Sequence, residues 1–104
     1  VAHRIVSGGT CHGPARECDA QVLDALRAAA RLAPLHGPWA LAAIEAMTRM
    51  PSPPQAQVAV LDSGFFDDLP ETARRVALPR AVVEEFGLWR RGYHGLAHQA
   101  LWRH

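Results

Sequence analysis

The hydrophobic and polar positions of the chain repeat with two different periods. Apolar and β-branched residues dominate 1–6 and 58–62, and the second run ends in Asp62. A short continuous apolar run is typical of a strand, and the run before Asp62 predicts a strand that is buried on both faces. Apolar residues at helical spacing predict helices over 20–32 and 39–50. Strands that alternate with helices indicate an α/β layer architecture.

The second half of the chain predicts shorter elements. Glycine, proline and polar residues favour loops over 10–18 and 63–68, and three prolines favour an extended linker after residue 50. Three short helices are predicted, over 70–76, 80–86 and 96–102. The residues at 88–93 fit either a strand or an extended lead into the glycines that follow them.

Length, charge and cysteine content narrow the classes of function. A chain of 104 residues is enough for one small domain. Its formal net charge of +1 excludes strong charge-driven binding to nucleic acid or to a membrane surface. No apolar run approaches the roughly 20 residues that span a bilayer, and we expect no signal peptide. Two cysteines are too few for a disulfide framework, so we expect a cytoplasmic setting. Because the chain begins with Val1, we expect a piece of a larger protein.

Three polar residues stand at the ends of strand-like runs, each beside glycine. Arg4 precedes a Ser-Gly-Gly turn, Asp62 precedes Ser-Gly, and His94 lies between two glycines. In open α/β sheets, ligands bind beyond the carboxyl ends of the strands, so these three residues are candidates for a site. Each also has a structural interpretation: Arg4 as a surface ion-pair partner, Asp62 as a helix or turn cap, and His94 as a hydrogen-bonded structural residue.

Two further patterns are weaker. Four soft metal ligands occur in the first third of the chain, but their spacing follows no known zinc pattern; they are Cys11, His12, Cys18 and His36. His94 and His98 are four apart, without the acid that would complete a metal motif. The arginines and tryptophans of 89–104 resemble in composition a surface that binds single-stranded nucleic acid. The near-zero net charge argues against that function.

Four segments of the chain, taken together and in the same order, resemble the motifs of one protein family. The segments at 3–9 (HRIVSGG), 32–38 (LAPLHGP), 58–65 (VAVLDSGF) and 93–98 (YHGLAH) are similar to the HRVVHGG, LAPLHNP, VAVFDTAF and FHGTSH words of acetate and propionate kinases. The four words occur at compatible spacing over nearly the whole chain. Chance agreement of that kind is improbable.

The resemblance implies a fold and a place within it. These kinases have the two-domain architecture of sugar kinases and actin, which is ribonuclease H-like. The chain matches about a quarter of such an enzyme, so we expect 1–64 to be the end of the first domain and 65–104 the start of the second. The phosphate loop with its magnesium-binding Asn, the adenosine pockets and the carboxy-terminal metal-binding Glu of the family are then outside the 104 residues.

The resemblance also implies a reaction, in which the γ-phosphoryl group of ATP passes to a short carboxylate such as acetate or propionate. Arg4 would pair with the carboxylate, His94 would donate to a phosphoryl oxygen, and Asp62 would orient Arg4 or a metal-bound water. Three residues match the apolar pocket for the methyl group: Val6, Leu35 and Tyr93. The family implies ATP and magnesium as cofactors of the parent enzyme, which we expect to be a cytoplasmic homodimer.

Departures from the family words leave an alternative open. The positions that differ around the three charged or ionisable residues are Ser7, Thr10, Gly37, Phe66, Leu96 and Ala97. Leu96 and Ala97 replace hydroxyl residues, which removes two possible hydrogen bonds near the phosphate. The chain therefore fits a divergent carboxylate kinase, and the alternative is a non-catalytic pseudoenzyme remnant or interaction module. We expect the 104 residues alone to have no kinase activity.

Overall fold

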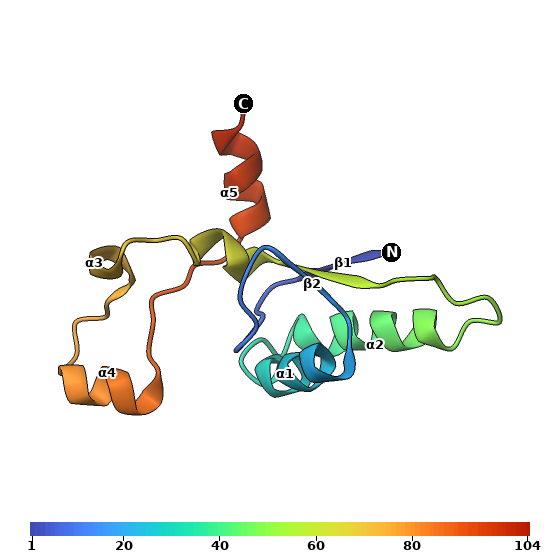
Figure 1. The fold of residues 1–104 in the computed structure, drawn as a ribbon, viewed down its shortest axis with the longest axis horizontal. Coiled ribbons are helices and arrows are strands. Elements are labelled where there is room, and N and C mark those ends of the chain that lie inside the picture. Colours follow the sequence, from blue (N-terminus) through green and yellow to red (C-terminus); the bar gives the residue numbers. More distant parts are fainter.

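A computed structural model describes residues 1–104, and its centre is a three-stranded mixed sheet. The strands are β1 (Ala2–Ile5), β2 (Ala15–Glu17) and β3 (Val58–Leu61), in the spatial order β1-β3-β2. β1 runs parallel to β3, and β2 runs antiparallel to it (Figure 1). The alternation of strands and helices along the chain confirms the predicted α/β class.

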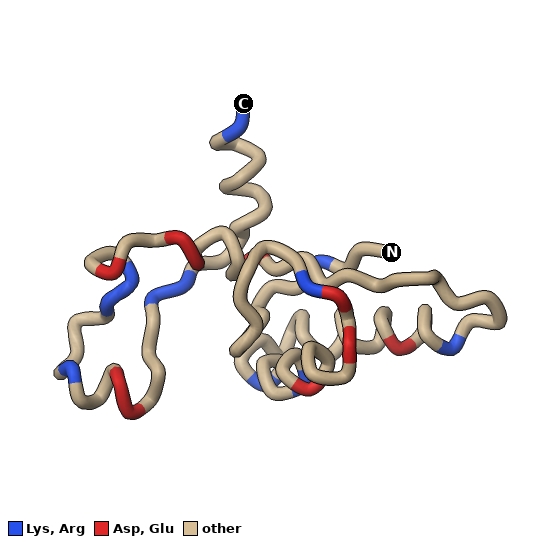
Figure 2. The backbone as a smooth tube through the Cα atoms, in the orientation of Figure 1, with Lys and Arg blue, Asp and Glu red and all other residues tan.

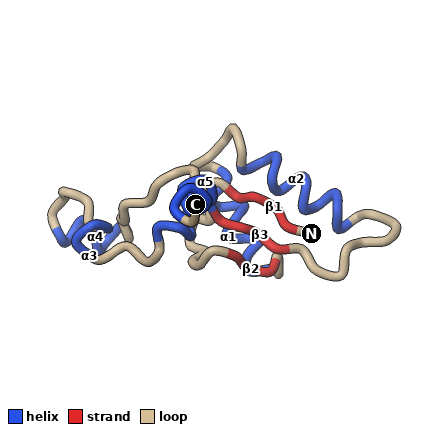
Figure 3. Tube along the Cα trace, turned by 90° about the horizontal axis from the view of Figure 1, so that it is seen from above, coloured by secondary structure: helices blue, strands red, loops and turns tan.

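Two helices cover one face of the sheet. They are α1 (Ala20–Ala30) and α2 (Gly37–Thr48), and Figure 1 shows both below the strands. The Asp19 carboxylate caps α1 by accepting a hydrogen bond from the Val22 N–H at 2.8 Å. The two helices supply the crossover that a parallel pair such as β1 and β3 requires. Seen from above, β1 and β3 lie between α2 and β2 (Figure 3).

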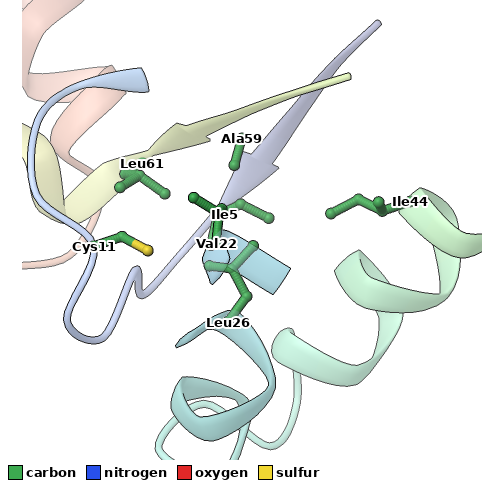
Figure 4. Packing of buried hydrophobic residues seen from close by; sticks show 7 residues of the cluster. All are labelled: Ile5, Cys11, Val22, Leu26, Ile44, Ala59 and Leu61. Carbon is green, nitrogen blue, oxygen red and sulfur yellow. The ribbon is translucent and has the colours of Figure 1, made fainter. Parts of the chain in front are cut away.

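The hydrophobic core lies between this sheet and these helices (Figure 4). Seven buried residues form it: Ile5, Cys11, Val22, Leu26, Ile44, Ala59 and Leu61. Along β3, only Ala59 and Leu61 face the core, whereas Val58 and Val60 are half-buried. The prediction of a strand buried on both faces was therefore wrong, because helices cover one face of the sheet only.

The remaining elements extend away from the sheet. They are the 3₁₀ helix η1 (Asp62–Phe66), α3 (Glu71–Arg74), α4 (Arg80–Phe86) and α5 (Gly95–Trp102). In Figure 1, α5 projects from η1 on one side and the chain through α3 and α4 forms a separate loop on another. The Cα radius of gyration is 15.0 Å, against about 13 Å for a compact domain of this length. The molecule is therefore more open than an ordinary small domain.

Several predicted boundaries differ from the structure. The predicted loop over 10–18 contains β2, a short edge strand that adds to β3 and has no sequence period of its own. The predicted loop over 63–68 begins as η1, and α3 is only four residues long. Of the two interpretations of 88–93, the extended lead is correct, because no strand forms there.

Charged residues are distributed over both halves of the chain, and acidic and basic residues are interspersed (Figure 2). Several form pairs four residues apart, as Arg80 and Glu84 do in α4, and as Glu45 of α2 does with Arg49, which caps the end of that helix. No helix of the structure is both long and apolar enough to cross a membrane.

Candidate functional site

The register of the sheet brings Arg4 and Asp62 to the same face and the same end. Arg4 pairs with Val60 across the parallel strands, and Asp62 follows Val60 by two residues. Because side chains alternate between faces, Arg4, Val60 and Asp62 all lie opposite the helix-covered face. The carboxyl ends of β1 and β3 meet at this edge, where a site was predicted.

Arg4 and Asp62 form an ion pair there. The Asp62 Oδ2 atom accepts hydrogen bonds from Arg4 Nη2 at 2.8 Å and from Arg4 Nε at 3.2 Å. The Asp62 side chain is 1% exposed, whereas that of Arg4 is 54% exposed. The Arg4 Nη1 group makes no hydrogen bond within the chain, so part of the guanidinium is available to a ligand.

The other oxygen of Asp62 holds the start of α5. Asp62 Oδ1 accepts a hydrogen bond from the Leu96 N–H at 3.1 Å, at the positive end of the helix dipole. Gly95 packs so closely on the Asp62 carbonyl oxygen that a Cβ at this position would overlap it. Asp62 therefore joins β1 to α5, and the glycine before Leu96 permits the close approach.

His94 precedes α5 in an uncommon backbone conformation. Its φ of 60° and ψ of 29° are left-handed, and no other non-glycine residue of the chain has a positive φ. Such conformations occur preferentially at functional sites, where the surrounding structure maintains them. The conformation directs the chain sharply from 88–93 into α5 and leaves His94 exposed.

One open cavity of about 640 Å³ brings the predicted residues together. It is lined by all six of them, namely Arg4, Val6, Leu35, Asp62, Tyr93 and His94. Three further lining residues were not predicted as site residues: Ala33, Pro34 and His36. These three belong to the 32–38 segment, so the motif that pointed to Leu35 could also have indicated them. For His36 the sequence suggests only metal binding, together with the two cysteines and His12.

The structure shows what surrounds three of the departures from the family words. The Phe66 ring fills the space beside Gly92, where even a Cβ would collide with it, and it stacks edge-on with Phe65. Leu96 contributes its backbone N–H to Asp62, which a lost hydroxyl does not affect. Gly37 packs directly on Ala30 of α1, so an Asn at this position would require the two helices to separate.

The structure does not gather a metal-ligand cluster. No group of three or more His, Cys, Asp or Glu side chains is placed to hold a metal ion, so the four-ligand zinc alternative is not supported. Cys11 is buried in the core, and both cysteines are free thiols. Burial raises the pKa of the Cys18 thiol above its ordinary value, with the charges of Asp19 and Glu17 contributing less.

Comparisons with known proteins agree with the family motifs. The model of the Acetokinase family matches residues 1–103. The chain belongs to the acetokinase family. An acetate kinase of Pseudomonas aeruginosa is 47% identical to this acetokinase chain over 100 residues, which are 95% of the chain and 25% of the relative. An acetate kinase of Deinococcus radiodurans is 40% identical over 94% of the chain and 24% of the relative.

Solved structures of the acetokinase family share the fold. The crystal structure of Porphyromonas gingivalis acetate kinase matches with a TM-score of 0.78 and 35% identity, over 93% of this chain and 24% of that one. A propionate kinase from Francisella tularensis matches with a TM-score of 0.78 and 31% identity, over 94% and 26%. The chain thus spans about a quarter of the length of its relatives and is a fragment of their α/β, actin-like fold.

Proposed function

We propose that the chain forms the carboxylate-handling part of an acetate kinase-like phosphotransferase, which transfers the γ-phosphoryl group of ATP to a short-chain carboxylate. The observation that carries the proposal is the meeting of Arg4, Asp62 and His94 at one cavity. These residues come from three distant parts of the chain. A cationic fork, an anchoring carboxylate and an imidazole around one open cavity suit the binding of anions.

Arg4 has the chemistry that the acceptor requires. A short carboxylate is already ionised at neutral pH, so no strong base is needed to create the nucleophile. The difficulty is to bring two anions together, and Arg4 would offset both charges through the Nη1 group that Asp62 leaves free. Asp62 itself would be a positioning residue, because its Oδ2 atom fixes the guanidinium.

In the transfer step, a carboxylate oxygen of the acceptor attacks the γ-phosphorus in line. The bond from that phosphorus to the bridging oxygen breaks, which gives an acyl phosphate and ADP. His94 would donate a hydrogen bond to an equatorial phosphoryl oxygen as charge develops there. One preorganised donor of this kind contributes about 3 kcal/mol of transition-state stabilisation.

The apolar part of the cavity would accept the alkyl group of the acceptor. Val6, Leu35 and Tyr93 line it, and Leu35 is 80% exposed in the chain as it stands. One methylene in an apolar pocket changes the binding free energy by about 1–3 kcal/mol, so the enzyme would discriminate only weakly between acetate and propionate.

The residues present do not fit a magnesium ion. Asp62 is the only carboxylate that lines the cavity, and its two oxygens already accept three hydrogen bonds. Magnesium prefers several oxygen ligands in octahedral geometry. The magnesium and most of the ATP would therefore be held by parts of the parent enzyme outside these residues.

A chimera tests the proposal. The matching quarter of the P. aeruginosa acetate kinase is replaced by this chain, and acyl phosphate formed from ATP and acetate is trapped as the hydroxamate. We expect turnover in the chimera, and Arg4→Ala should lower it by about 10²–10³-fold. Arg16→Ala is the matched control, because Arg16 is exposed on β2 and should leave turnover unchanged. The isolated chain should show no turnover.

A folded chimera without turnover would instead favour the second function, a non-catalytic pseudoenzyme remnant or interaction module. The observations that favour this alternative are the replaced residues around the cavity, such as Phe66 and Ala97, and the exposed apolar side chains of α5. Reversal of Phe66 and Ala97 to the family's His and Ser in the chimera would distinguish the two. Recovery of turnover would assign the loss to these substitutions.

Three further features belong to the same proposal. We assign 1–64 to the end of the first kinase domain and 65–104 to the start of the second. The sheet and its core fall in the first range, and η1 and α5 lie at the junction. We also propose a cytoplasmic location and a homodimeric parent enzyme, as the family resemblance implies.

A further inference from the structure

The loop after β1 is joined to later parts of the chain by polar contacts that the proposed reaction does not use. Arg91 Nη1 donates a hydrogen bond to the Gly9 carbonyl at 2.5 Å, and Arg91 Nη2 lies 3.4 Å from His12 Nδ1. Asp67 Oδ1 lies 3.6 Å from the same His12 nitrogen, and Asp67 Oδ2 accepts from the Gly13 N–H at 2.6 Å. We call these five residues the clasp.

The clasp bridges a long separation in sequence. Arg91 is 82 residues from Gly9 and 79 from His12. The backbone N–H groups of 88–94 that form hydrogen bonds donate to other parts of the chain. The Arg90 N–H, for example, donates a hydrogen bond to the Arg74 carbonyl oxygen at 2.8 Å. Through Arg91 alone, therefore, the residues just before His94 hydrogen-bond to the part of the chain that carries Arg4.

This connection matters because 88–94 has no regular secondary structure to hold it. Tyr93 and His94 line the cavity from this stretch, and His94 keeps a left-handed backbone that its surroundings must maintain. The planar guanidinium of Arg91 offers several donors in a fixed geometry, which suits simultaneous contact with a carbonyl oxygen and a ring nitrogen. Asp67, whose side chain is 16% exposed, lies beside the same His12 nitrogen.

We propose that Arg91 is a positioning residue for the cavity. By fixing 91–94 to the loop at 9–13, it holds Tyr93 and His94 beside Arg4 and keeps α5 docked on Asp62. This proposal rests on the proposed function, since Arg91 touches no substrate and acts through the cavity residues.

The amide of Leu96 reports the docking directly, because it donates to Asp62 Oδ1 at 3.1 Å. Hydrogen exchange of the ¹⁵N-labelled 104-residue chain is measured by NMR. Arg91→Gln should accelerate exchange of the Leu96 amide about tenfold, as expected when a charge-assisted hydrogen bond is lost. The Cys18 amide, bonded to the Gln57 carbonyl at 2.8 Å within the sheet, should keep its rate. Arg90→Gln is the control, since Arg90 is exposed and only its backbone is hydrogen-bonded.

A second measurement separates positioning from mere structural support. Acetate is titrated into the same samples, and the ring resonances of His94 are followed. In the native chain we expect a saturable shift, and Arg91→Gln should weaken the Kd for acetate about tenfold. Arg91→Lys keeps one donor for the Gly9 carbonyl and should lie between the two.

Unchanged Leu96 exchange in Arg91→Gln would overturn the proposal. Faster exchange with an unchanged Kd would also overturn it, because Arg91 would then support structure only. If Arg91→Gln also exposes the Cys18 amide, the variant has unfolded, and Arg91→Lys decides by the same two readings. If acetate shifts nothing in the native chain, the proposed function fails. Faster Leu96 exchange in Arg91→Gln would then still support Arg91 as the residue that keeps α5 docked on Asp62, and unchanged exchange would overturn that role as well.

Discussion

Residues 1–64 and residues 65–104 bury their apolar side chains to very different extents. All seven members of the core cluster lie in the first region, and several of them are less than 5% exposed. In the second region, Val83 is the only buried hydrophobic side chain, while Leu101 and Trp102 are 78% and 87% exposed. The first region is therefore stabilised by the hydrophobic effect, and the second is attached through a few specific contacts.

This difference explains why the cavity is built as it is. Arg4 lies on β1, whose other face is packed in the core, and Val6 directly follows this strand. Tyr93 and His94 come from the region without a core, so their position depends on Asp62, on the close fit of Gly95 and on Arg91. One side of the cavity therefore belongs to the packed first region, and the other side is held in place by a few specific contacts. Variants of the two sides should consequently affect stability by different amounts.

The largest effect is expected from Ile44→Ala, which removes a side chain that is 1% exposed in the core of the first region. The substitution should lower the free energy of unfolding by about 2–5 kcal/mol, from lost burial and the cavity left behind. The midpoint and slope of urea unfolding, followed by circular dichroism, measure it. Trp102→Ala is the matched control and should change the free energy by less than about 0.5 kcal/mol, because the ring is almost fully exposed. Equal effects of the two variants would contradict the comparison.

Gly95→Ala should have the next largest effect. The new Cβ would overlap the Asp62 carbonyl oxygen, so α5 must move away from η1 at a cost of about 1–3 kcal/mol. Gly87→Ala is the control: Gly87 has a φ of 57° and open space around it, so only the left-handed strain of about 1 kcal/mol remains. NMR shifts of Leu96 and Asp62 should change in the first variant only. Retention of the native Leu96 shift in Gly95→Ala would show that the close packing is not needed.

The sequence predicts the first region better than the second, for a physical reason. Helical periodicity located α1 because a single face of it packs on the sheet, which leaves a clear pattern in the chain. The pattern of α2 is weaker, and Pro38 in its first turn marked where it begins. The short strand β2 was missed because its three residues are all exposed, so no apolar pattern marks them. The stretch at 88–93 stayed undecided because its conformation is set by contacts with Arg74 and Gly9, far away in sequence.

The candidate site shows the same limit. Arg4, Asp62 and His94 were predicted from strand ends and from the family words, and the structure brings them to one cavity. The hydrogen bond from the Leu96 amide to Asp62 could not be predicted, because a backbone donor has no sequence signature. Arg91 was overlooked for a related reason: its partner is a backbone carbonyl, which every residue possesses.

A smaller effect is expected at the cysteines, which report how tightly the first region closes. Because burial raises the pKa of the Cys18 thiol, less thiolate is present at pH 8 than in a free cysteine. Cys18 should therefore react with a disulfide reagent more slowly than glutathione does, and the buried Cys11 should react more slowly still. In urea both should react at the rate of the small thiol. A native rate for Cys18 equal to that of glutathione would contradict closure around it.

The smallest effect is expected at Glu71 in α3, which belongs to the region without a core. The hydrogen bond from Arg75, and then its charge, lower the pKa of the Glu71 carboxyl below its ordinary value. The pair therefore stabilises α3 at pH values above the ordinary pKa, and the stabilisation is lost as the pH falls through the lowered pKa. The Glu71 carboxyl is followed by NMR over this range. Arg75→Gln should return its midpoint to the ordinary value, and added salt should act in the same direction, since the pair is exposed. An unchanged midpoint in Arg75→Gln would show that even this local pair does not form in solution.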